Sequence, residues 1–450
     1  MTSISARLDR LPITSTHRMA FLALAFAYFF ELGDLNTFAY AAPGIIHGWG
    51  ISVDTVAAIT AASFGGMFIG AMTGGTLANR IGRKRAFILS TLFYSAFSLL
   101  NAFAWDVSSL AVLRFLTGIG LSSMTVIANT YIGEFFPARL RGHYMGLTMT
   151  IGLVGIPATA WVARFVVPSA PWGWRLVFVW GALGIVAIAF ATRMVESPRW
   201  LSIHGRAEEA DDVVRRLEKE AERHGRLPTA ETRPDEPPRP RRGYMTALRA
   251  PHLGRTVFVG AISIVSTLGF YGFMAWVPTL LYQHGFSVTR SLTYTSVIAL
   301  CNPVGALIAA FLMERIDRKW FNAGVSFWVA ACVLLYGLAD TPARIMLLGA
   351  LVIIGLQAGA TGLYIYSSEL FPTEIRSLGV GMTYGAGRLT NVAGPFIIAA
   401  VYSSLGYSAV FLTVAGTFLL LTLLYAVLGP RTTGRPLEAV SPGTTSAQAV

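Results

Sequence analysis

The sequence predicts an all-α membrane protein with twelve transmembrane helices arranged as two six-helix pseudo-repeats. Three observations support this fold class: 54% of the 450 residues are hydrophobic and only 13% are charged, apolar runs recur along the chain, and most basic residues lie on one side of those runs. Soluble proteins carry about 25% charged residues. A run of about 20 apolar residues is long enough to cross a bilayer as a helix. The composition therefore excludes an ordinary soluble protein.

The apolar runs define the expected helices in order. In the first half they cover residues 19–46, 54–78, 86–104, 108–132, 144–166 and 174–194. In the second half they cover residues 255–282, 290–313, 320–339, 343–367, 378–403 and 407–429. We therefore expect a first six-helix bundle (1–194), a connector (195–254), a second six-helix bundle (255–430) and a disordered tail (431–450).

The connector is the only long polar segment between the runs. Residues 205–226 are rich in charge and contain the spaced pairs Asp211–Arg215 and Asp212–Arg216, a pattern that suits an exposed surface helix. Residues 228–242 are rich in Pro and Arg and indicate a flexible linker. We expect this connector to have no activity of its own.

Charge placement orients the chain. If both tails and the connector lie on one side of the membrane, that side holds most of the 35 Lys and Arg residues, and the other side keeps Arg164, Arg175, Arg290 and Arg344. The positive-inside rule then places both termini and the connector in the cytoplasm. This topology explains the net charge of +12, and no basic groove or reader motif indicates nucleic-acid binding. The two cysteines lie inside apolar runs, which excludes a disulfide framework and a cysteine-built metal site.

Two segments of the first half recur in the second. Residues 75–84 (GTLANRIGRK) are answered by 310–319 (AFLMERIDRK), and residues 134–141 (EFFPARLR) by 369–376 (ELFPTEIR). Both matches have an offset of 235 residues, which indicates duplication of a six-helix segment. Two six-helix repeats with a binding site near the membrane midplane are typical of transporters.

The repeated segments also predict a gate. Their short basic turns can form arginine–acid latches that hold the cytoplasmic ends of the two halves together in one state. Each of the later segments adds an acid and a base, seven residues apart, across a proline that ends the helix. The gating candidates are Arg80, Arg83, Glu134, Arg141, Glu314, Arg315, Glu369 and Arg376. The alternative is that they only anchor the topology at the lipid headgroups.

These segments, together with residues 114–120 (RFLTGIG) and 196–201 (ESPRWL), resemble the signatures of the major facilitator superfamily, in its sugar-porter and organic-ion branches. The resemblance covers about residues 19–430 and implies transport by alternating access, with Glu196 and Arg199 added to the gate. The family usually has Asp where this chain has Asn79, which weakens the expected latch of the first half.

Four charged residues lie inside apolar helices: Glu31, Asp34, Arg114 and Arg388. Each such charge costs about 2.5–3.5 kcal/mol even on the lenient insertion scale, so it must face a partner or a water-filled cavity. Glu31 and Asp34 are three residues apart and share a helix face. A movement that makes or breaks an Asp34–Arg114 pair would load and release one proton per cycle. In sugar-porter relatives, a pair that resembles this one is associated with proton coupling. The alternative is a permanent ion pair that only stiffens the first half.

Arg388 predicts an anionic substrate. Tyr384, Arg388 and Asn391 share one helical face, and a guanidinium offers a planar fork that matches a carboxylate. A flat ring held between aromatic side chains, with polar groups nearby, completes the expected site. These further candidates are Phe270, Tyr271, Trp276, Tyr364, Gln357, Thr361 and Asn129. The alternative is that Arg388 pairs with Glu31 or Asp34.

The pattern around Arg388 is similar to that of organic-anion and aromatic-acid transporters, and residues 7–18 resemble the amino terminus of bacterial nicotinate permeases. The resemblance implies uptake of a small aromatic monocarboxylate, nicotinate first and a hydroxybenzoate-like acid second, with a proton as the coupling ion and no cofactor. A multidrug or organic-cation exporter, a sugar or polyol porter and a transporter-like sensor remain alternatives. No Ser/His/Asp set, phosphate loop or metal cluster indicates an enzyme. We expect a monomer in the lipid bilayer of the bacterial inner membrane.

Overall fold

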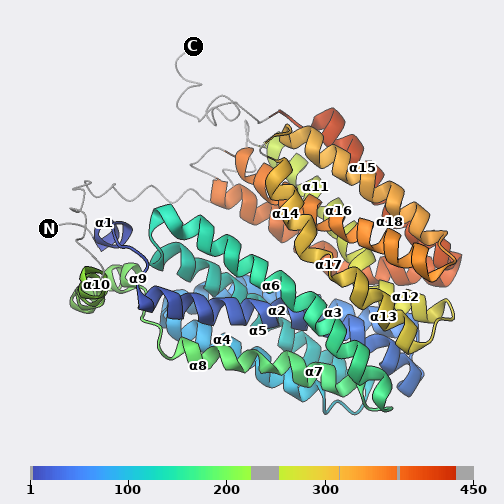
Figure 1. Cartoon of the computed structure of the whole chain (residues 1–450), viewed down its shortest axis with the longest axis horizontal. Helices are drawn as coiled ribbons and strands as arrows, with labels where there is room; N and C mark the ends of the chain where they lie inside the picture. Colours follow the sequence, from blue (N-terminus) through green and yellow to red (C-terminus); the bar gives the residue numbers. More distant parts are fainter. Residues whose placement is uncertain (1–3, 224–252, 314, 372–375, 432–450) are drawn as a thin grey trace. The chain divides into compact units, whose positions relative to one another are not determined.

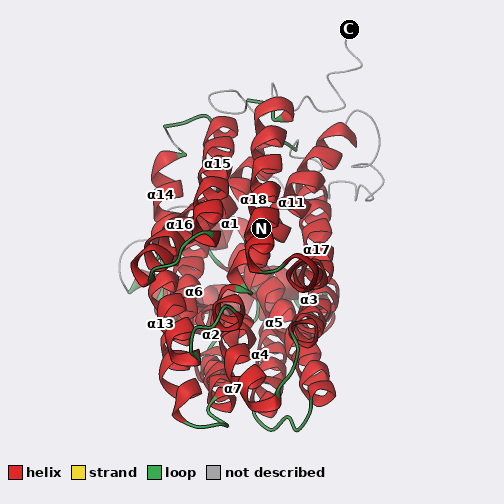
Figure 2. Cartoon of the chain, turned by 90° about the vertical axis from the view of Figure 1, so that its right-hand side faces the viewer, coloured by secondary structure: helices red, strands yellow, loops and turns green. Residues whose placement is uncertain are grey.

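The structure is a computed structural model that describes residues 4–223, 253–313, 315–371 and 376–431. Every regular element in those residues is a helix, as the colouring of Figure 2 shows. Within the described chain, ten helices are long and apolar enough to cross a membrane. The prediction of an all-α membrane fold is confirmed.

The chain forms two compact units. The first comprises Met1–Phe38, Ala62–Val162 and Gly173–Arg239. Its helices appear from blue to green in Figure 1. They are α1 (Ile4–Asp9), α2 (Ser15–Trp49), α3 (Val53–Ile81), α4 (Arg83–Asn101), α5 (Val107–Phe135), α6 (Ala138–Val166), α7 (Trp174–Ala182), η2 (Leu183–Ile185), α8 (Val186–Ala191), α9 (Pro198–Ile203) and α10 (Ala207–Glu222). The end of α2 and the start of α3 (residues 39–61) belong to the second unit, and so does the segment 163–172 that begins at the end of α6.

Glycines let α3 lie directly against α5. A Cβ atom at Gly66 would collide with the backbone carbonyl of Phe115, and one at Gly70 would collide with that of Ile119. Gly74, one further turn along, touches α5 in the same way. Small residues four apart are the usual means by which membrane helices approach closely, because packing rather than hydrophobic burial drives their association in lipid.

The helix α4 has a different composition from its neighbours. It begins with three basic residues, and its buried face carries polar side chains from Ser90 to Asn101. This polarity explains why α4, although about 28 Å long at 1.5 Å per residue, is not among the ten apolar helices.

The second compact unit comprises Ala39–Ala61, Ala163–Trp172 and Pro240–Val450. Its described helices include α11 (Leu253–Met274), α12 (Val277–Gln283), α13 (Val288–Ala299), α14 (Asn302–Leu312), α15 (Arg318–Gly337), α16 (Pro342–Glu369), α17 (Arg376–Leu405), α18 (Tyr407–Leu423) and the π-helical turn η4 (Leu424–Leu428). Two expected spans are interrupted. The first breaks before Pro278 and the second before Pro303, because proline lacks the amide hydrogen that would continue the helix.

Helices are present in all twelve ranges that the sequence predicted. The largest difference at a helix start is at α6, which begins at Ala138 directly after Pro137 rather than at residue 144. The expected surface helix in the connector is α10, but it is exposed on one face only. Ala210, Val214 and Leu217 are buried, since this face packs against the rest of the unit. The expected linker (228–242) and most of the expected tail (432–450) lie outside the described residues.

Candidate functional site

The first unit contains a buried ion pair. Nη1 of Arg114 on α5 lies 3.4 Å from Oδ2 of Asp34 on α2, and the two residues are 1% and 0% exposed. Ser98 donates a hydrogen bond of 2.5 Å to the other carboxylate oxygen. Arg114 also donates to the hydroxyls of Thr37 (3.2 Å) and Ser63 (3.1 Å). The sequence analysis predicted this pair, and the structure brings it together.

The pair is loose by the standards of charged hydrogen bonds. Tight N–H···O contacts between ions measure about 2.7–2.9 Å, whereas the Asp34–Arg114 contact is 3.4 Å. Each partner has neutral hydroxyl groups that remain as hydrogen-bond partners if the ionic contact opens. Such an arrangement can lose the contact without leaving either group unsolvated, which a proton-coupling pair needs.

Glu31 lies one turn away on α2 and is 4% exposed. Thr125 of α5 donates a hydrogen bond of 2.9 Å to its Oε1 atom. Asn129, one turn further along α5, is exposed. The first unit therefore holds two buried carboxylates on one helix, each contacted by a hydroxyl group from a neighbouring helix.

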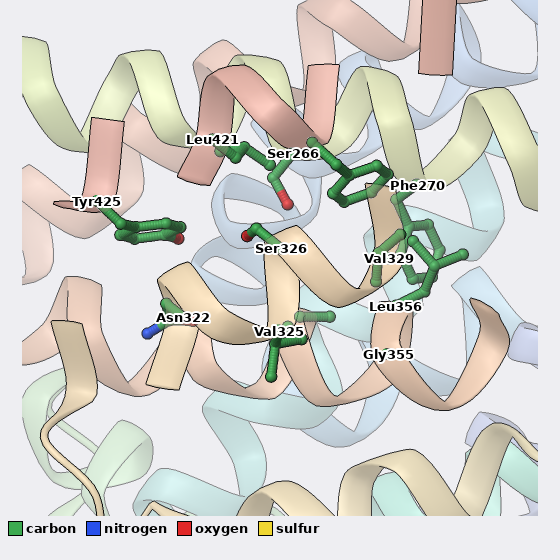
Figure 3. Close-up of a pocket in the computed structure, with 13 residues that line it drawn as sticks. Ser266, Phe270, Asn322, Val325, Ser326, Val329, Gly355, Leu356, Leu421 and Tyr425 are labelled. Atoms are coloured by element: carbon green, nitrogen blue, oxygen red, sulfur yellow. The ribbon is translucent and has the colours of Figure 1, made fainter. Parts of the chain in front are cut away.

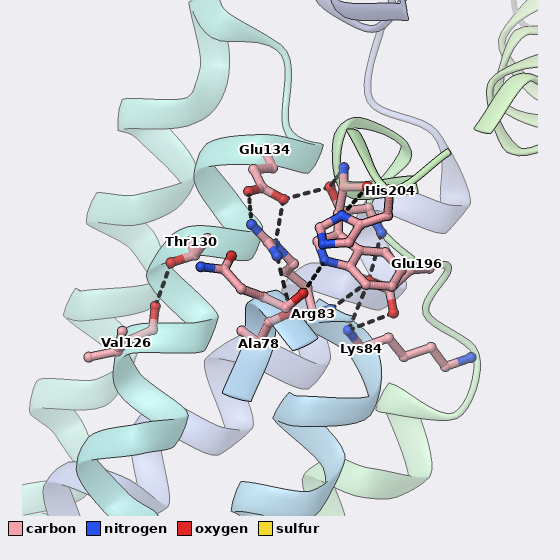
Figure 4. Close-up of polar contacts among 11 residues, drawn as sticks. Ala78, Arg83, Lys84, Val126, Thr130, Glu134, Glu196 and His204 are labelled. Atoms are coloured by element: carbon pink, nitrogen blue, oxygen red, sulfur yellow. Dashed lines mark hydrogen bonds and ion pairs between the residues drawn. The ribbon is translucent and has the colours of Figure 1, made fainter. Parts of the chain in front are cut away.

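A second cluster of charges surrounds the turn between α3 and α4, and Figure 4 shows its contacts. Arg83 donates to both carboxylate oxygens of Glu134, at 2.9 and 2.6 Å, and Ser197 donates to the same carboxylate at 2.7 Å. Arg83 is 7% exposed. The bidentate geometry makes this the best-formed ion pair of the gating set.

Glu196 stabilises the start of α4. Its carboxylate accepts from the backbone amides of Arg83 (2.7 Å) and Lys84 (3.1 Å), which have no partner inside the helix. Gly82 precedes them at φ +94°, and a Cβ there would collide with Glu196. Glu196 thus acts as a helix cap from a distant segment, and only glycine fits beneath it.

The second unit repeats this cluster at the predicted offset. Arg318 donates to Glu369 at 3.2 Å and to the carbonyl of Met313 at 2.8 Å. The Arg318–Glu369 contact corresponds to the Arg83–Glu134 contact of the first unit. The bond from Arg318 to the Met313 carbonyl corresponds to the bond of 3.1 Å from Arg83 to the carbonyl of Ala78. Each pair lies inside its own unit.

The other gating candidates have different surroundings. Arg199 contacts Asp9 at 3.0 Å and Arg141 contacts the same oxygen at 3.9 Å. The Arg315 guanidinium lies 3.8 Å from the centre of the Phe311 ring. Arg80 is exposed. Glu314 and the side chain of Arg376 lie outside the described residues.

The amino-terminal segment is fastened to the connector, which the sequence analysis did not predict. Arg7 donates to both oxygens of Glu218, at 3.0 and 2.6 Å, and also contacts Asp211; Arg10 adds a bond of 2.6 Å to Glu218. The hydrogen bond to Glu218 is the main reason that the pKa of Arg7 lies above its ordinary value. Burial alone would raise the pKa of Glu218, but the hydrogen bonds from Arg7 and Arg10 outweigh it and lower that pKa. Asp9 accepts from the first amide of α6, at Ala138, at 3.0 Å.

Arg388 lies on α17 and is partly buried. Within the described residues of the second unit, its guanidinium makes no ion pair or hydrogen bond. Asn391, one turn away, is 6% exposed, and its Oδ1 atom has no partner among the described residues. The side chain of Tyr384 is outside the described part of the chain.

Gln357 has a structural partner. Its amide donates to Asn302 at 2.7 Å, and Asn302 in turn donates to the carbonyl of Ala299 at the break between α13 and α14. The hydroxyl of Thr361 donates back to the carbonyl of Gln357. These contacts hold the interrupted helix in place, so part of the hydrogen-bonding capacity of Gln357 is already used.

The predicted aromatic residues do not form one cluster. Phe270 lines a pocket inside the second unit, between α11, α15, α16 and α18, where Ser326 and Tyr425 also lie (Figure 3). Tyr271 pairs with the Phe270 ring at 5.1 Å. Trp276 is 2% exposed and belongs to the core, whereas Tyr364 is 55% exposed.

The sequence analysis missed the small hydroxyl residues that complete the buried pair, Ser98, Thr37 and Ser63. A signal for Ser98 was available, because the polar residues of α4 recur at helical spacing on one face. The partner of a serine cannot be read from its own helix, however, since the hydroxyl suits almost any acceptor.

Two repeats with the same order of helices, and a buried Asp34–Arg114 ion pair in the first, are the features of a membrane transport protein. Residues 19–443 match the family described as "Sugar (and other) transporter", and the chain belongs to this family of the major facilitator superfamily. It is 43% identical over 96% of both chains to the "Putative metabolite transport protein YyaJ" of Bacillus subtilis. It is 29% identical to the niacin transporter NiaP of Acinetobacter baylyi, over 97% of this chain and 99% of that one. The fold is similar to that of the xylose transporter XylE from E. coli, with a TM-score of 0.72 and 17% identity over 94% of this chain and all of the other.

The family consists of transporters rather than enzymes. The chain is therefore a multi-pass membrane protein that transports a small organic substrate.

Proposed function

We propose that the protein takes up a small aromatic monocarboxylate together with a proton, with nicotinate as the first candidate and a hydroxybenzoate-like acid as the second. Two kinds of observation support this proposal. The Acinetobacter relative, similar over nearly its whole length, is named a niacin transporter. The second unit also carries a membrane-embedded cation that can bind a carboxylate.

The contrast between two arginines carries the proposal. Arg114 has the carboxylate of Asp34 beside it. Arg388 has no acid partner within the described residues of its unit. A guanidinium in an apolar helix needs an anion, and a monocarboxylate fits its two parallel donors. The amide oxygen of Asn391 can accept a hydrogen bond from a substrate hydroxyl or a protonated ring nitrogen.

Asp34 and Arg114 supply the coupling. Protonation of Asp34 removes the charge that Arg114 faces, and the hydroxyls of Ser98 and Thr37 remain to solvate the neutral acid. The Asp34 carboxyl group binds a proton and releases it once in each transport cycle. One proton is therefore carried across the membrane together with the substrate. Glu31 offers a second buried carboxylate on the same helix.

The proposal includes a location and an orientation. We propose that the Arg83 end of the helices, both termini and the connector lie in the cytoplasm of a bacterial cell, because basic residues gather there, and that the protein acts as a monomer in the inner membrane. In this orientation Arg83–Glu134 and Arg318–Glu369 brace the cytoplasmic ends of the two repeats.

Uptake into proteoliposomes tests the proposal. Wild-type protein should concentrate radiolabelled nicotinate against its gradient when the outside is acidic. Asp34→Asn should abolish this accumulation and retain exchange of labelled for unlabelled nicotinate, because only exchange proceeds without proton release. Arg388→Gln should abolish both, and Arg388→Lys should raise KM. Accumulation by Asp34→Asn, or normal exchange by Arg388→Gln, would contradict the roles assigned here.

The alternative substrate class is an organic cation, because Glu31 is a buried carboxylate that a cation could face. Thermal stabilisation of purified protein distinguishes the two classes, since only ligands of the folded state stabilise it. Stabilisation by nicotinate or 4-hydroxybenzoate supports the anion, and stabilisation by lipophilic cations alone refutes it.

A further inference from the structure

The buried face of α4 carries a line of polar side chains. Ser90, Thr91, Tyr94, Ser95 and Ser98 are each 4% exposed or less. Their spacing of three or four residues places them on one side of the helix, one turn after another. Small hydroxyl residues are common where membrane helices pack closely, so burial alone does not indicate a function for these hydroxyls, and their hydrogen-bond partners decide it.

This line ends at the coupling carboxylate. Ser98 donates to Asp34 at 2.5 Å and also lies 3.2 Å from the carbonyl of Phe178 on α7. From Ser98 the line continues toward the Arg83 end of α4. Thr91 is seven residues away, or about 10 Å along the helix axis.

The hydroxyls beyond Ser98 lack the partners that hydroxyls in membrane helices normally have. Thr60 and Thr130 donate to the carbonyl four residues back, as is usual. The hydroxyl of Thr91 is buried and has no hydrogen-bond partner among the described residues, and the buried hydroxyls of Tyr94 and Ser95 contact only one another. In folded proteins, most buried polar groups without a protein partner bind internal water.

Glycines on the facing helix leave space for these groups. A Cβ at Gly181 on α7 would touch both the Asp34 carboxylate and the Ser98 hydroxyl, and a Cβ at Gly184 on η2 would touch the Tyr94 hydroxyl. The two glycines are three residues apart, so they follow the same line as the hydroxyls. At this point the span changes from α7 to the 3-10 turn η2.

We propose that Thr91, Tyr94, Ser95 and Ser98 form a hydroxyl seam that holds ordered water and carries a proton between Asp34 and the Arg83 end of α4. The inference rests on the proton coupling proposed above. During uptake the protonated Asp34 carboxyl gives its proton to the adjacent hydroxyl or water, each group along the seam passes one proton to the next, and the last gives a proton to cytoplasmic water at the Arg83 end. One O–H bond forms for each that breaks, and rotation of the hydroxyls and waters then restores the starting orientation of the seam.

The double variant Thr91→Val, Ser95→Ala tests the seam, with Thr130→Val as the matched control because the Thr130 hydroxyl is bonded to its own helix. The assay compares nicotinate accumulation driven by a pH gradient with nicotinate exchange at equal pH. We expect accumulation to be slowed at least tenfold, because positioned groups that transfer protons typically contribute about 10²–10⁴-fold and internal water can replace part of the seam. Exchange should change by less than about twofold, since the substrate site is unaltered. The control should behave as the wild type.

Two outcomes overturn the seam. Equal loss of accumulation and exchange would show that the hydroxyls only support the fold, and unchanged accumulation would show that protons take another route. Tyr94→Phe, which removes one oxygen and keeps the ring, provides a second variant if the double variant does not fold, and the same two outcomes apply to it. Asp34→Asn separates the seam from the proposed function. If Asp34→Asn loses accumulation but the seam variants keep it, the seam alone is wrong; if Asp34→Asn still accumulates nicotinate, the coupling proposal and the seam are both wrong.

Discussion

Glu134→Gln should destabilise the protein much more than the equivalent change Glu369→Gln in the other repeat. Glu134 accepts three hydrogen bonds, two from Arg83 and one from Ser197. Glu369 accepts one from Arg318 among the described residues. The offset of 235 residues makes the two glutamates equivalent in the helical plan, so each substitution is a control for the other.

The magnitude follows from these contacts. A hydrogen bond to a charged group contributes about 1.5–3 kcal/mol, and a glutamine at position 134 can still accept one or two of the three bonds. Its amide group also faces the donor nitrogens of Arg83. We therefore expect a loss of about 2–4 kcal/mol for Glu134→Gln and about 1–2 kcal/mol for Glu369→Gln. For about 200 residues per unit, the first corresponds to a fall of about 5–10 °C in melting temperature.

The assay is thermal unfolding of purified protein in detergent, followed by tryptophan fluorescence at one scan rate. Ser197→Ala should cause a smaller loss than Glu134→Gln, because it removes only one of the three bonds. If Glu369→Gln lowers the melting temperature as much as Glu134→Gln does, the number of bonds on the carboxylate does not determine the stability of these pairs.

Two further predictions concern the first unit. Gly66→Ala should prevent α3 from packing against Phe115 and greatly reduce the amount of folded protein on size-exclusion chromatography. Gly75→Ala is the control and should be tolerated, because a Cβ there would make only ordinary contacts. Normal behaviour of both variants would show that the two helices can separate at no cost. Glu218→Gln should lower the melting temperature at pH 7 but not at low pH. The folded pKa of Glu218 lies below its ordinary value of 4.5, so its contribution is present above that pH and is lost as pH falls through the folded pKa. A difference from the wild type that does not shrink as the pH is lowered would refute the role of its charge.

The sequence was sufficient to predict the order of the helices and to identify the charged residues inside them. Apolar length located the spans because a bilayer sets the length of a helix that crosses it. The Asp34–Arg114 pair was predictable because charges in hydrocarbon are so costly that the few present must face one another or water. The common offset likewise predicted that Arg83 and Arg318 occupy equivalent places.

Contacts between distant segments were not predictable to the same degree. Glu196 caps α4 although more than a hundred residues separate them, and the sequence carried no mark of that partnership. The fastening of Arg7 to Glu218 was hidden for the same reason. Charged residues on a surface helix have many possible partners, and only the packed chain selects among them.

The duplication also shows where the two repeats differ in their charged residues. At the offset of 235 residues, Asp34 is answered by Gly269 and Arg114 by Gly349, and both glycines are packed tightly by neighbouring side chains. Arg388 is answered by Leu153. The repeats thus share the braces at their Arg83 and Arg318 ends but not their membrane-embedded charges. A carboxylate–guanidinium pair in one repeat suits the binding and release of a proton, and a guanidinium without an acid on its own helix in the other suits an anion. Because each charge is costly in the membrane, its presence in only one repeat supports the division of labour that we propose, with proton binding in the first repeat and substrate binding in the second.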